Sequence, residues 1–487
     1  MHMGQSDNKK NNIILITTDQ QRFDTIAALG NRTILTPHLD WLSEEGTVFE
    51  RFYADCPVCM PSRGTIMTGL QGYKSGCVGN FPDRLPMKFH DTLPGILTRN
   101  GYQTRGVGKM HFEPARANYG FEHIDLALNY YREMREHPER GIPKDHGTGE
   151  NEMEPALSSV HESYSMTHWV TKKSIDFLET RDPTRPFFLW TSFTKPHPPF
   201  DPCLNYWNLY EDGQMEAPVY GNWSDSLEDM DESWLYDTYM LNHAYRMTPP
   251  QLQKVKRAYY ALITQIDYSL GLLFARVREL GLLDSTWIIF TSDHGEMLGD
   301  HHMGAKFVFL EGSAHVPLLI RPPYAPFSHH SLEGKRSKRL AEMADLFPTI
   351  LSMAGIDAPQ QAEGVNLLAS ADEERRTPFY GNVENRLFTV MEGYEKYLWT
   401  AYGGAELFFD LRKDPMERED LSKNPEYADR LEYFRGLLAA HMLENGAACC
   451  VKGGLPAPVK ERQTRGEICR WPGFHSAKER PEVDGLH

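Results

Sequence analysis

Short apolar segments alternate along this chain with helix-like segments, and this alternation constrains its fold more than any other feature. Strands are expected over residues 12–18, 47–54, 102–107, 186–193 and 285–291. Helices are expected over residues 37–45, 92–100, 168–180 and 251–280. Continuously apolar strands separated by helices are typical of a parallel sheet that is covered on both faces. We therefore predict an α/β protein with a mostly parallel sheet sandwiched by helices.

The pattern changes late in the chain. Residues 377–409 resemble short strands with turns, and residues 427–443 resemble one amphipathic helix. We therefore predict three parts: a main domain at 1–370, a smaller α+β subdomain at 371–445 and a tail at 446–487. The tail is rich in glycine, proline and charge, and we expect it to dock on the body or on a second copy of the chain, which makes a homo-oligomer a hypothesis. Two long segments, 120–162 and 206–248, are expected to be loops, which in compact domains are often functional.

The overall charge limits the classes of partner. The net charge is −16, and a nucleic-acid surface needs clustered cations, so we expect no nucleic-acid partner. An anionic substrate stays open, because a local cationic cleft can oppose the global charge. The longest apolar runs are far too short to cross a bilayer, so no membrane partner is expected.

The compartment is predicted from the first residues and from the cysteines. No apolar leader segment follows the polar start of the chain, so we expect a cytoplasmic protein; if a leader was removed, the protein is periplasmic or secreted. The seven cysteines form no even disulfide framework, and in a reducing compartment most would be free thiols.

Polar side chains follow four of the predicted strands. The residues at these strand ends are carboxylates, an amide, histidines and a lysine: Asp19, Gln20, Lys109, His111, His197, Asp293 and His294. Each has a structural alternative, such as a helix cap, a turn residue or a hydrogen-bonded core histidine. Because the carboxyl ends of parallel strands meet at one edge of a sheet, their conjunction predicts a cationic site around a metal.

Four of these residues suit a hard divalent cation. Asp19, Gln20 and Asp293 offer oxygen ligands, and His294 could add a nitrogen. This mixture leaves Ca²⁺, Mg²⁺ and Mn²⁺ open. A structural zinc site is not indicated, because no cysteine pair has the required spacing to histidines.

One cysteine carries the most specific motif. Cys56 and Cys59 form a C-x-x-C pair, which on its own fits a thioredoxin-like redox site. The continuation Cys59-Met60-Pro61-Ser62-Arg63, however, resembles the signature of the formylglycine-dependent sulfatases. The resemblance extends from about residue 12 to 421 and includes the segments 34–40, 108–111, 292–295, 316–318, 345–350 and 407–411.

The resemblance implies an alkaline-phosphatase-like core and the hydrolysis of a sulfate ester that releases inorganic sulfate. It also implies that a formylglycine-generating or anaerobic sulfatase-maturating enzyme oxidises Cys59 to formylglycine. The hydrated aldehyde has two hydroxyls: one attacks sulfur, and the other later expels the sulfate as the carbonyl re-forms. The expected cofactor is Ca²⁺, with Mg²⁺ or Mn²⁺ as alternatives, held by the four residues named above.

The family pattern also implies roles around the nucleophile. Arg63 would orient the hydrate, and Lys109 and Lys306 would bind the sulfate oxygens. His197, together with Lys306, would protonate the leaving oxygen, and His111 would be the base for the second hydroxyl. A weaker substrate contact is expected from one further residue: Asn80.

The substrate is less constrained. Many sulfatases have a second aspartate where this chain has Gln20. In this respect the chain resembles the related phosphonate monoester hydrolases and choline sulfatases, which also have a glutamine at that place. Aromatic residues of the long segments could stack on a sugar or aryl group, or could simply pack: Trp207, Tyr210, Trp223, Trp234 and Tyr239. The tail residues 470–475 share this ambiguity.

Three kinds of function remain open at this stage. We expect a sulfate ester on a carbohydrate of the glycosaminoglycan type. The alternatives are an aryl or choline sulfatase or a phosphonate monoester or phosphodiester hydrolase. A further alternative is an inactive, sulfatase-like binding protein.

Overall fold

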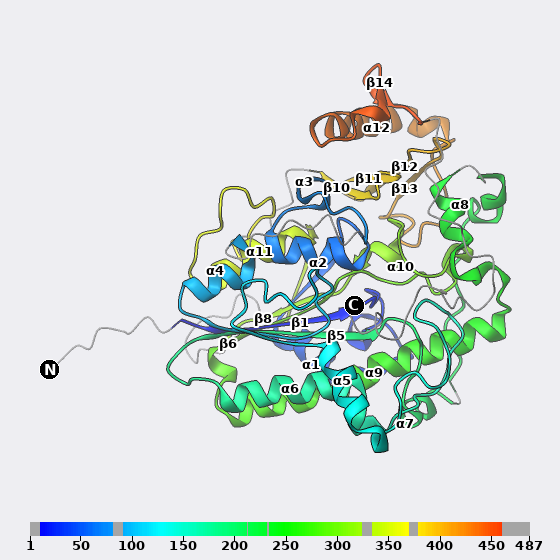
Figure 1. Ribbon diagram of the computed structural model, residues 1–487. Coiled ribbons are helices and arrows are strands. Elements are labelled where there is room, and N and C mark those ends of the chain that lie inside the picture. Colours follow the sequence, from blue (N-terminus) through cyan, green and yellow to red (C-terminus); the bar gives the residue numbers. More distant parts are fainter. Residues whose placement is uncertain are drawn as a thin grey trace.

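A computed structural model describes residues 10–80, 91–211, 213–230, 233–323, 334–369 and 378–459 of the chain. Within these residues nine strands form one main sheet (Figure 1). The strands are β1 (Asn12–Asp19), β2 (Thr47–Tyr53), β3 (Gln103–Gly108), β4 (His123–Leu126), β5 (Phe187–Pro196), β6 (Thr286–Ser292), β7 (His315–Val316), β8 (Leu318–Arg321) and β9 (Lys335–Glu342).

The main sheet is mostly parallel, as predicted. Its order is β4-β3-β5-β1-β6-β8-β2-β7, with β9 paired to β2. β1 pairs in parallel with β5 and β6, and β3 pairs in parallel with β4 and β5. β8 runs antiparallel to both β6 and β2, so one side of the sheet is mixed. All residues of the central β1 are buried, which explains why its sequence is continuously apolar instead of alternating.

Helices cover both faces of the sheet (Figure 1). Below it in this view lie α1, α6 and α9, and above it lie α2, α4 and α11. Leu39, Trp169 and Leu270 fill the core on the first side, and Ile66 and Leu346 belong to the core on the second. The helices are α1 (Pro37–Glu45), α2 (Cys59–Thr68), α3 (Gly72–Ser75), α4 (Leu93–Arg99), α5 (Ala127–Glu136), α6 (Met166–Thr180), α7 (Leu204–Asn208), α8 (Trp234–Tyr239), α9 (Pro249–Glu279), α10 (Glu311–Ala314) and α11 (Leu346–Met353).

The periodic segments fold as predicted, whereas the two expected loops do not. All nine helices and strands predicted before residue 292 are present, with ends shifted by at most a few residues. The prediction of a loop over 120–162 is wrong in its first part, because β4 and α5 lie there. Short helices also interrupt the segment 206–248. The helices of the second segment are too short for a recognisable repeat, whereas α5 buries Ala127, Tyr130 and Met134 at helical spacing, a repeat that the loop prediction overlooked.

A second, antiparallel sheet follows the main domain. It consists of β10 (Phe379–Val383), β11 (Leu387–Glu392), β12 (Glu395–Thr400) and β13 (Glu406–Asp410). α12 (Ala428–Glu444) covers it, and the hairpin of β14 (Val451–Lys452) and β15 (Leu455–Pro456) lies against α12 (Figure 1). The smaller α+β part is therefore confirmed. The boundary at 370/371 and the tail segment 470–475 lie outside the described residues, so the division of the chain stays a prediction.

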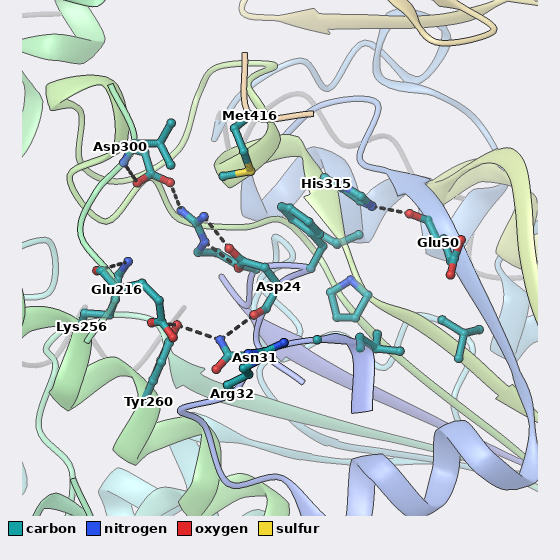
Figure 2. Close-up of a pocket in the computed structure, with 18 of the residues that line it drawn as sticks. Asp24, Asn31, Arg32, Glu50, Glu216, Lys256, Tyr260, Asp300, His315 and Met416 are labelled. Carbon is teal, nitrogen blue, oxygen red and sulfur yellow. Dashed lines mark hydrogen bonds and ion pairs between the residues drawn. The ribbon is translucent and has the colours of Figure 1, made fainter. Parts of the chain in front are cut away.

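A cavity of about 610 Å³ lies beside β2, and Figure 2 shows its lining. Its charged groups are largely paired with one another. Tyr260 donates to Glu216 across 2.9 Å, Lys256 donates to the Glu216 carbonyl across 2.8 Å, and Arg336 contacts Glu50 across 3.3 Å. No helix among the described residues is both long and apolar enough to span a membrane.

Candidate active site

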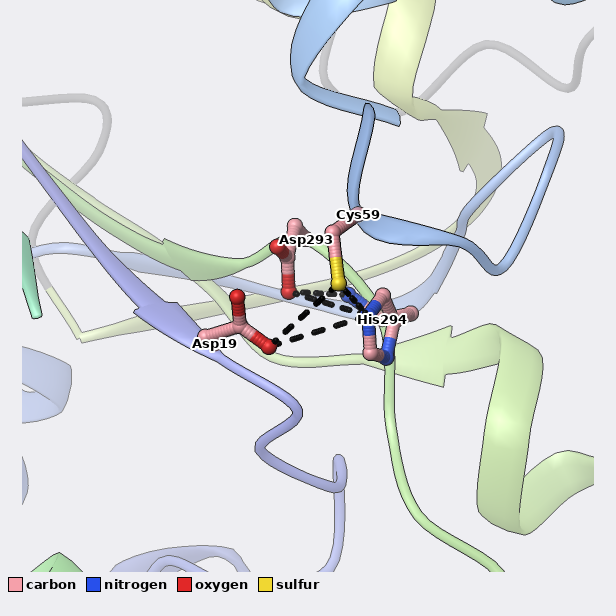
Figure 3. A group of neighbouring side chains, drawn as sticks. All are labelled: Asp19, Cys59, Asp293 and His294. Atoms are coloured by element: carbon pink, nitrogen blue, oxygen red, sulfur yellow. Dashed lines mark hydrogen bonds and ion pairs between the residues drawn. The ribbon is translucent and has the colours of Figure 1, made fainter. Parts of the chain in front are cut away.

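Three elements bring together four side chains of the kinds that can bind a metal ion. Asp19 ends β1, Asp293 and His294 follow β6, and Cys59 begins α2, as Figure 3 shows. One candidate ligand atom from each residue lies within 4.8 Å of all the others, and all four residues are buried. The sequence places Asp19 and Asp293 some 270 residues apart, and the parallel pairing of β1 with β6 brings them side by side. The structure thus brings three of the predicted strand-end residues, Asp19, Asp293 and His294, together with Cys59.

The first turn of α2 presents Cys59 to the cluster. The Sγ atom lies 3.1 Å from Nε2 of His294 and 3.8 Å from Oδ1 of Asp19. The side-chain oxygen of Asn80 accepts a hydrogen bond from the Met60 amide across 3.1 Å, so Asn80 satisfies one donor of this helix terminus. A helix N-terminus also favours negative charge, which suits a site for an anion.

Arg63 on α2 connects this helix to the ends of β1 and β6. Its Nε donates to Oδ2 of Asp293 across 2.8 Å, and one terminal nitrogen lies 3.4 Å from Oδ2 of Asp19. The other terminal nitrogen donates to the Lys109 carbonyl and to Oγ of Ser192, both across 2.7 Å. The side chain is fully buried. Only a guanidinium can make this set of bonds, because its donors point in several fixed directions.

Lys109 supplies a second buried cation. Its Nζ lies 2.7 Å from Oδ2 of Asp19. Burial alone would raise the pKa of Asp19, but Lys109, His197 and Arg63 hold that pKa well below its usual value. Asp19 is thus kept as a carboxylate, the form that binds a cation.

Lys306 and His197 complete the cationic side. Nζ of Lys306 donates to Oε1 of Gln20 across 2.6 Å and lies 3.1 Å from Nε2 of His197. Nδ1 of His197 lies 2.7 Å from the Pro198 carbonyl, so this nitrogen carries the proton and Nε2 faces Lys306 as an acceptor. Burial together with Lys306 and Lys109 lowers the pKa of His197 well below its usual value.

The same cations act on residue 59. Burial and Asp19 would raise the pKa of the Cys59 thiol, but Lys306, Lys109 and His294 outweigh them and lower it. For His294, burial would lower the pKa, yet Asp293 and Cys59 raise it. By contrast, burial and Asp55 raise the pKa of Cys56, whose sulfur donates only to the Val78 carbonyl across 3.5 Å. The two cysteines therefore have opposite environments, which does not fit a thioredoxin-like pair.

Two buried residues belong to the cluster although the sequence analysis gave them no role. Ser192 follows the apolar part of β5, and its hydroxyl accepts from Arg63. Glu296 accepts hydrogen bonds from the Gln20 side chain and from two backbone amides. The only signal for Glu296 was its position three residues after Asp293, because a glutamate in a loop is usually exposed.

Two further predictions concern His111 and the aromatic residues of the long segments. His111 lies half-buried beyond β3 with a left-handed φ of 59°, and its role as a base stays a prediction. Of the aromatic residues that could have stacked on substrate, the simple packing alternative holds for the four that are buried in the hydrophobic core: Tyr210, Trp223, Trp234 and Tyr239.

The fifth aromatic residue also packs against the protein itself. Trp207 is partly buried, with the Arg257 guanidinium 3.9 Å from the centre of its ring.

Sequence comparison identifies a family and several relatives. The profile of the Sulfatase family matches residues 11–356. An arylsulfatase of Clostridium perfringens is 34% identical over 88% of this chain and 94% of its own length. A choline-sulfatase of Rhizobium meliloti is 29% identical over 89% of this chain and 87% of its own length.

Solved structures show the same architecture. The phosphonate monoester hydrolase of Agrobacterium radiobacter superimposes with a TM-score of 0.76 at 25% identity, covering 93% of this chain and all of the other. A second structure, described as being in complex with its substrate D-glucosamine-2-N,6-O-disulfate, superimposes with a TM-score of 0.70 at 22% identity, covering 90% of this chain and 98% of the other.

Proposed function

The chain belongs to the sulfatase family, and from that premise we propose that it hydrolyses sulfate esters with a formylglycine at position 59 and a bound divalent cation. Membership of the family and the arylsulfatase relatives make it a sulfuric ester hydrolase. The proposal concerns how this chain does so and on which esters.

The position of residue 59 among hard ligands carries the proposal. Asp19, Asp293 and the amide oxygen of Gln20 are the kind of donors that Ca²⁺ or Mg²⁺ prefers, and His294 adds a nitrogen. A thiol in their midst is a poor match, because sulfur is a soft ligand. Conversion of Cys59 to an aldehyde hydrate would replace that sulfur by oxygen and complete a uniformly hard site. The residues present therefore fit both the cation and the modification.

The chain's own groups would then divide the work. When bound, the cation activates the hydroxyl of residue 59 and offsets negative charge on the ester. Lys109 and Lys306 hold the sulfate oxygens, and Arg63 keeps the nucleophile in place. The Lys306–His197 pair holds a proton at Nζ, 3.1 Å from Nε2, and delivers it to the leaving oxygen. His111 takes the proton whose loss lets the aldehyde return.

The ester class is proposed at two levels. We retain a sulfated carbohydrate as the preferred substrate, supported by D-glucosamine-2-N,6-O-disulfate, the substrate of one structural neighbour. The relative of greatest overall identity among those described above is called an arylsulfatase, so aryl sulfates belong to the same proposal.

A second candidate is phosphonate monoester hydrolysis. Gln20 stands where many sulfatases have an aspartate, and the phosphonate monoester hydrolase of Agrobacterium radiobacter matches the fold over almost the whole chain. The chain has Lys109 and His111, which in the family pattern favour the sulfatase side.

Two measurements test the proposal. Peptide mass spectrometry of protein purified from its host should show the mass loss of thiol-to-aldehyde conversion at Cys59; an unmodified thiol in active enzyme would disprove the formylglycine mechanism. This modification requires a maturation enzyme as a partner. A panel of sulfated saccharides, aryl sulfates and phosphonate monoesters should give the highest kcat/KM with sulfate esters. Faster turnover of phosphonates would make the second candidate the correct one.

A further inference from the structure

Hydrogen bonds fix the backbone of Gln20 next to the cluster. What remains to be settled is whether the oxygen or the nitrogen of its side-chain amide faces Lys306. Its N–H donates to Oδ1 of Asp293 across 3.1 Å, and its carbonyl accepts from the Tyr259 hydroxyl across 2.6 Å. The residue has a left-handed φ of 74°, a conformation that costs free energy for a side chain and is kept where the surroundings enforce it. Only a rotation of the terminal amide can exchange the oxygen and the nitrogen.

Two charged neighbours decide that choice. Nε2 of Gln20 donates to Oε2 of Glu296, and Oε1 of Gln20 accepts from Nζ of Lys306 across 2.6 Å. A carboxylate can only accept hydrogen bonds, and an ammonium can only donate them. The reverse orientation would place the amide oxygen against the Glu296 carboxylate and the amide nitrogen against the Lys306 ammonium, and neither pair could form a hydrogen bond. The amide oxygen therefore faces Lys306, and the amide nitrogen faces Glu296.

Glu296 is in turn fixed by the loop that carries Lys306. Oε1 of Glu296 accepts from the amides of Leu298 and Ala305 across 3.1 and 2.5 Å. The side chain is completely buried. Both of its oxygens are thus occupied as acceptors, one by the loop and one by Gln20.

We infer that Glu296 is a positioning residue that turns the Gln20 amide so that its oxygen, not its nitrogen, is offered to the cation and to Lys306. This inference rests on the proposed function for the identity of the site as a cation site. It explains how the chain uses a glutamine where an aspartate would need no such control: an aspartate has two equivalent oxygens, whereas an amide has one.

The inference predicts the effect of E296Q. The oxygen of the introduced amide is claimed by Leu298 and Ala305, so its NH₂ group must face Gln20. Gln20 then turns its own oxygen toward that group and presents Nε2 to Lys306 and to the cation. Because such supporting contacts around metal ligands typically change affinity about 10- to 100-fold, Ca²⁺ binding should weaken by a factor in that range.

A compensating exchange separates orientation from mere structural support. Q20E in the E296Q background lets the new carboxylate accept from the new amide with one oxygen and offer the other to the cation. In the wild-type background Q20E faces Glu296 and brings two carboxylates together. Q20E should therefore tighten Ca²⁺ binding at least about ten-fold more in the E296Q background than in the wild-type background.

Isothermal titration with Ca²⁺ alone measures the affinities of the wild type, E296Q, Q20E and the double variant, each as the purified full chain. The comparison needs no measurement of turnover. The matched control is a second buried pair of the same chemistry at the far end of α2, where Gln71 donates to Glu342 across 2.7 Å; E342Q should leave Ca²⁺ affinity unchanged. Equal effects of Q20E in both backgrounds, or an E296Q variant that binds Ca²⁺ like the wild type, would overturn the inference.

Failure of the proposed function is distinguishable. If the wild type binds no divalent cation, the cation site is wrong, and the orientation is then judged by thermal unfolding of the metal-free proteins. Lys306 still needs an acceptor there, so Q20E should raise the melting temperature of E296Q and lower that of the wild type. Shifts of the same sign in both backgrounds would contradict the role of Glu296.

Discussion

At the scale of single residues, the site gathers buried cations in a protein with a net charge of −16. Arg63, Lys109 and Lys306 are buried, and each contacts a specific acceptor: Asp293, Asp19 and the neutral amide oxygen of Gln20. The sequence motif identified every one of these cations. It could not identify Glu296 or Ser192, because their importance comes from what they touch and not from their neighbours in the chain.

The proton that the Lys306–His197 pair would deliver to the leaving oxygen gives the first prediction. H197A should lower kcat by about 10²–10⁴-fold for an alkyl sulfate, whose leaving oxygen needs a proton, and far less for nitrophenyl sulfate, whose leaving group is stable as an anion. The ratio of kcat values for the two esters is the measurement. An equal loss on both esters would show that His197 only binds substrate.

At the scale of elements, the ends of the strands were predicted well and the connections poorly. Long periodic segments such as α9 fold where their apolar stripe predicts. β8 was not predicted, since four residues carry no period, and its antiparallel insertion between β6 and β2 depends on pairing that a single sequence does not reveal.

The close contact between the ends of β3 and β5 gives the second prediction. Gly108 has a φ of +97°, and a Cβ atom there would lie 1.9 Å from the Ser192 carbonyl oxygen. G108A should destabilise the protein by about 3 kcal/mol and disturb the adjacent Lys109. Urea unfolding measures the loss. G101A is the control, because Gly101 has a φ of +89° but open space around it, and it should cost only about 1–2 kcal/mol.

The packing of His441 on α12 against Tyr380 of β10, with Lys74 of α3 nearby, gives the third prediction, a pH dependence. The His441 ring stacks on Tyr380 at 3.9 Å, and burial together with Lys74 lowers its pKa to about 4. The unfolded chain takes up this proton first, near pH 6.5, so the neutral histidine stabilises the folded protein above that pH. The stabilisation is lost as the pH falls from about 6.5 toward about 4.

The variant H441F keeps the stacked ring and removes the titration. From pH 6.5 to 4, wild-type stability should fall by about 2 kcal/mol more than that of H441F. Thermal or urea unfolding at several pH values compares the two. Parallel stability curves would contradict the assignment.

At the scale of the whole molecule, a buried charge network joins the two sheets. Nζ of Lys396 on β12 donates to Glu311 across 2.6 Å, to Glu417 across 2.7 Å and to the Phe309 carbonyl across 2.9 Å. Glu311 also accepts from His315 across 2.6 Å. The network fixes the segment just after Lys306, so the second sheet helps to hold the site. Nothing in the sequence pattern predicted this connection, because its members are spread over a hundred residues.

The fourth prediction removes the shared cation. K396M should leave two carboxylates without their buried partner and destabilise the protein by about 3–5 kcal/mol. It should also lower kcat/KM, since the Lys306 segment loses its anchor. K413M, an exposed lysine of the same subdomain, is the control and should leave the melting temperature unchanged. An unaltered melting temperature in K396M would show that the network contributes nothing to stability.

The burial of Cys59 has a consequence for the order of events during synthesis. The side chain is 1% exposed, and His294, which contacts it, comes 235 residues later in the chain. At a synthesis rate of about 5–20 residues per second, position 59 leaves the ribosome roughly 10–50 s before the residues that enclose it exist. An enzyme that oxidises Cys59 can reach it only in that interval or in an unfolded chain. Slowing translation should then raise the fraction of aldehyde, and refolding of a purified, unmodified chain should seal the thiol permanently inside.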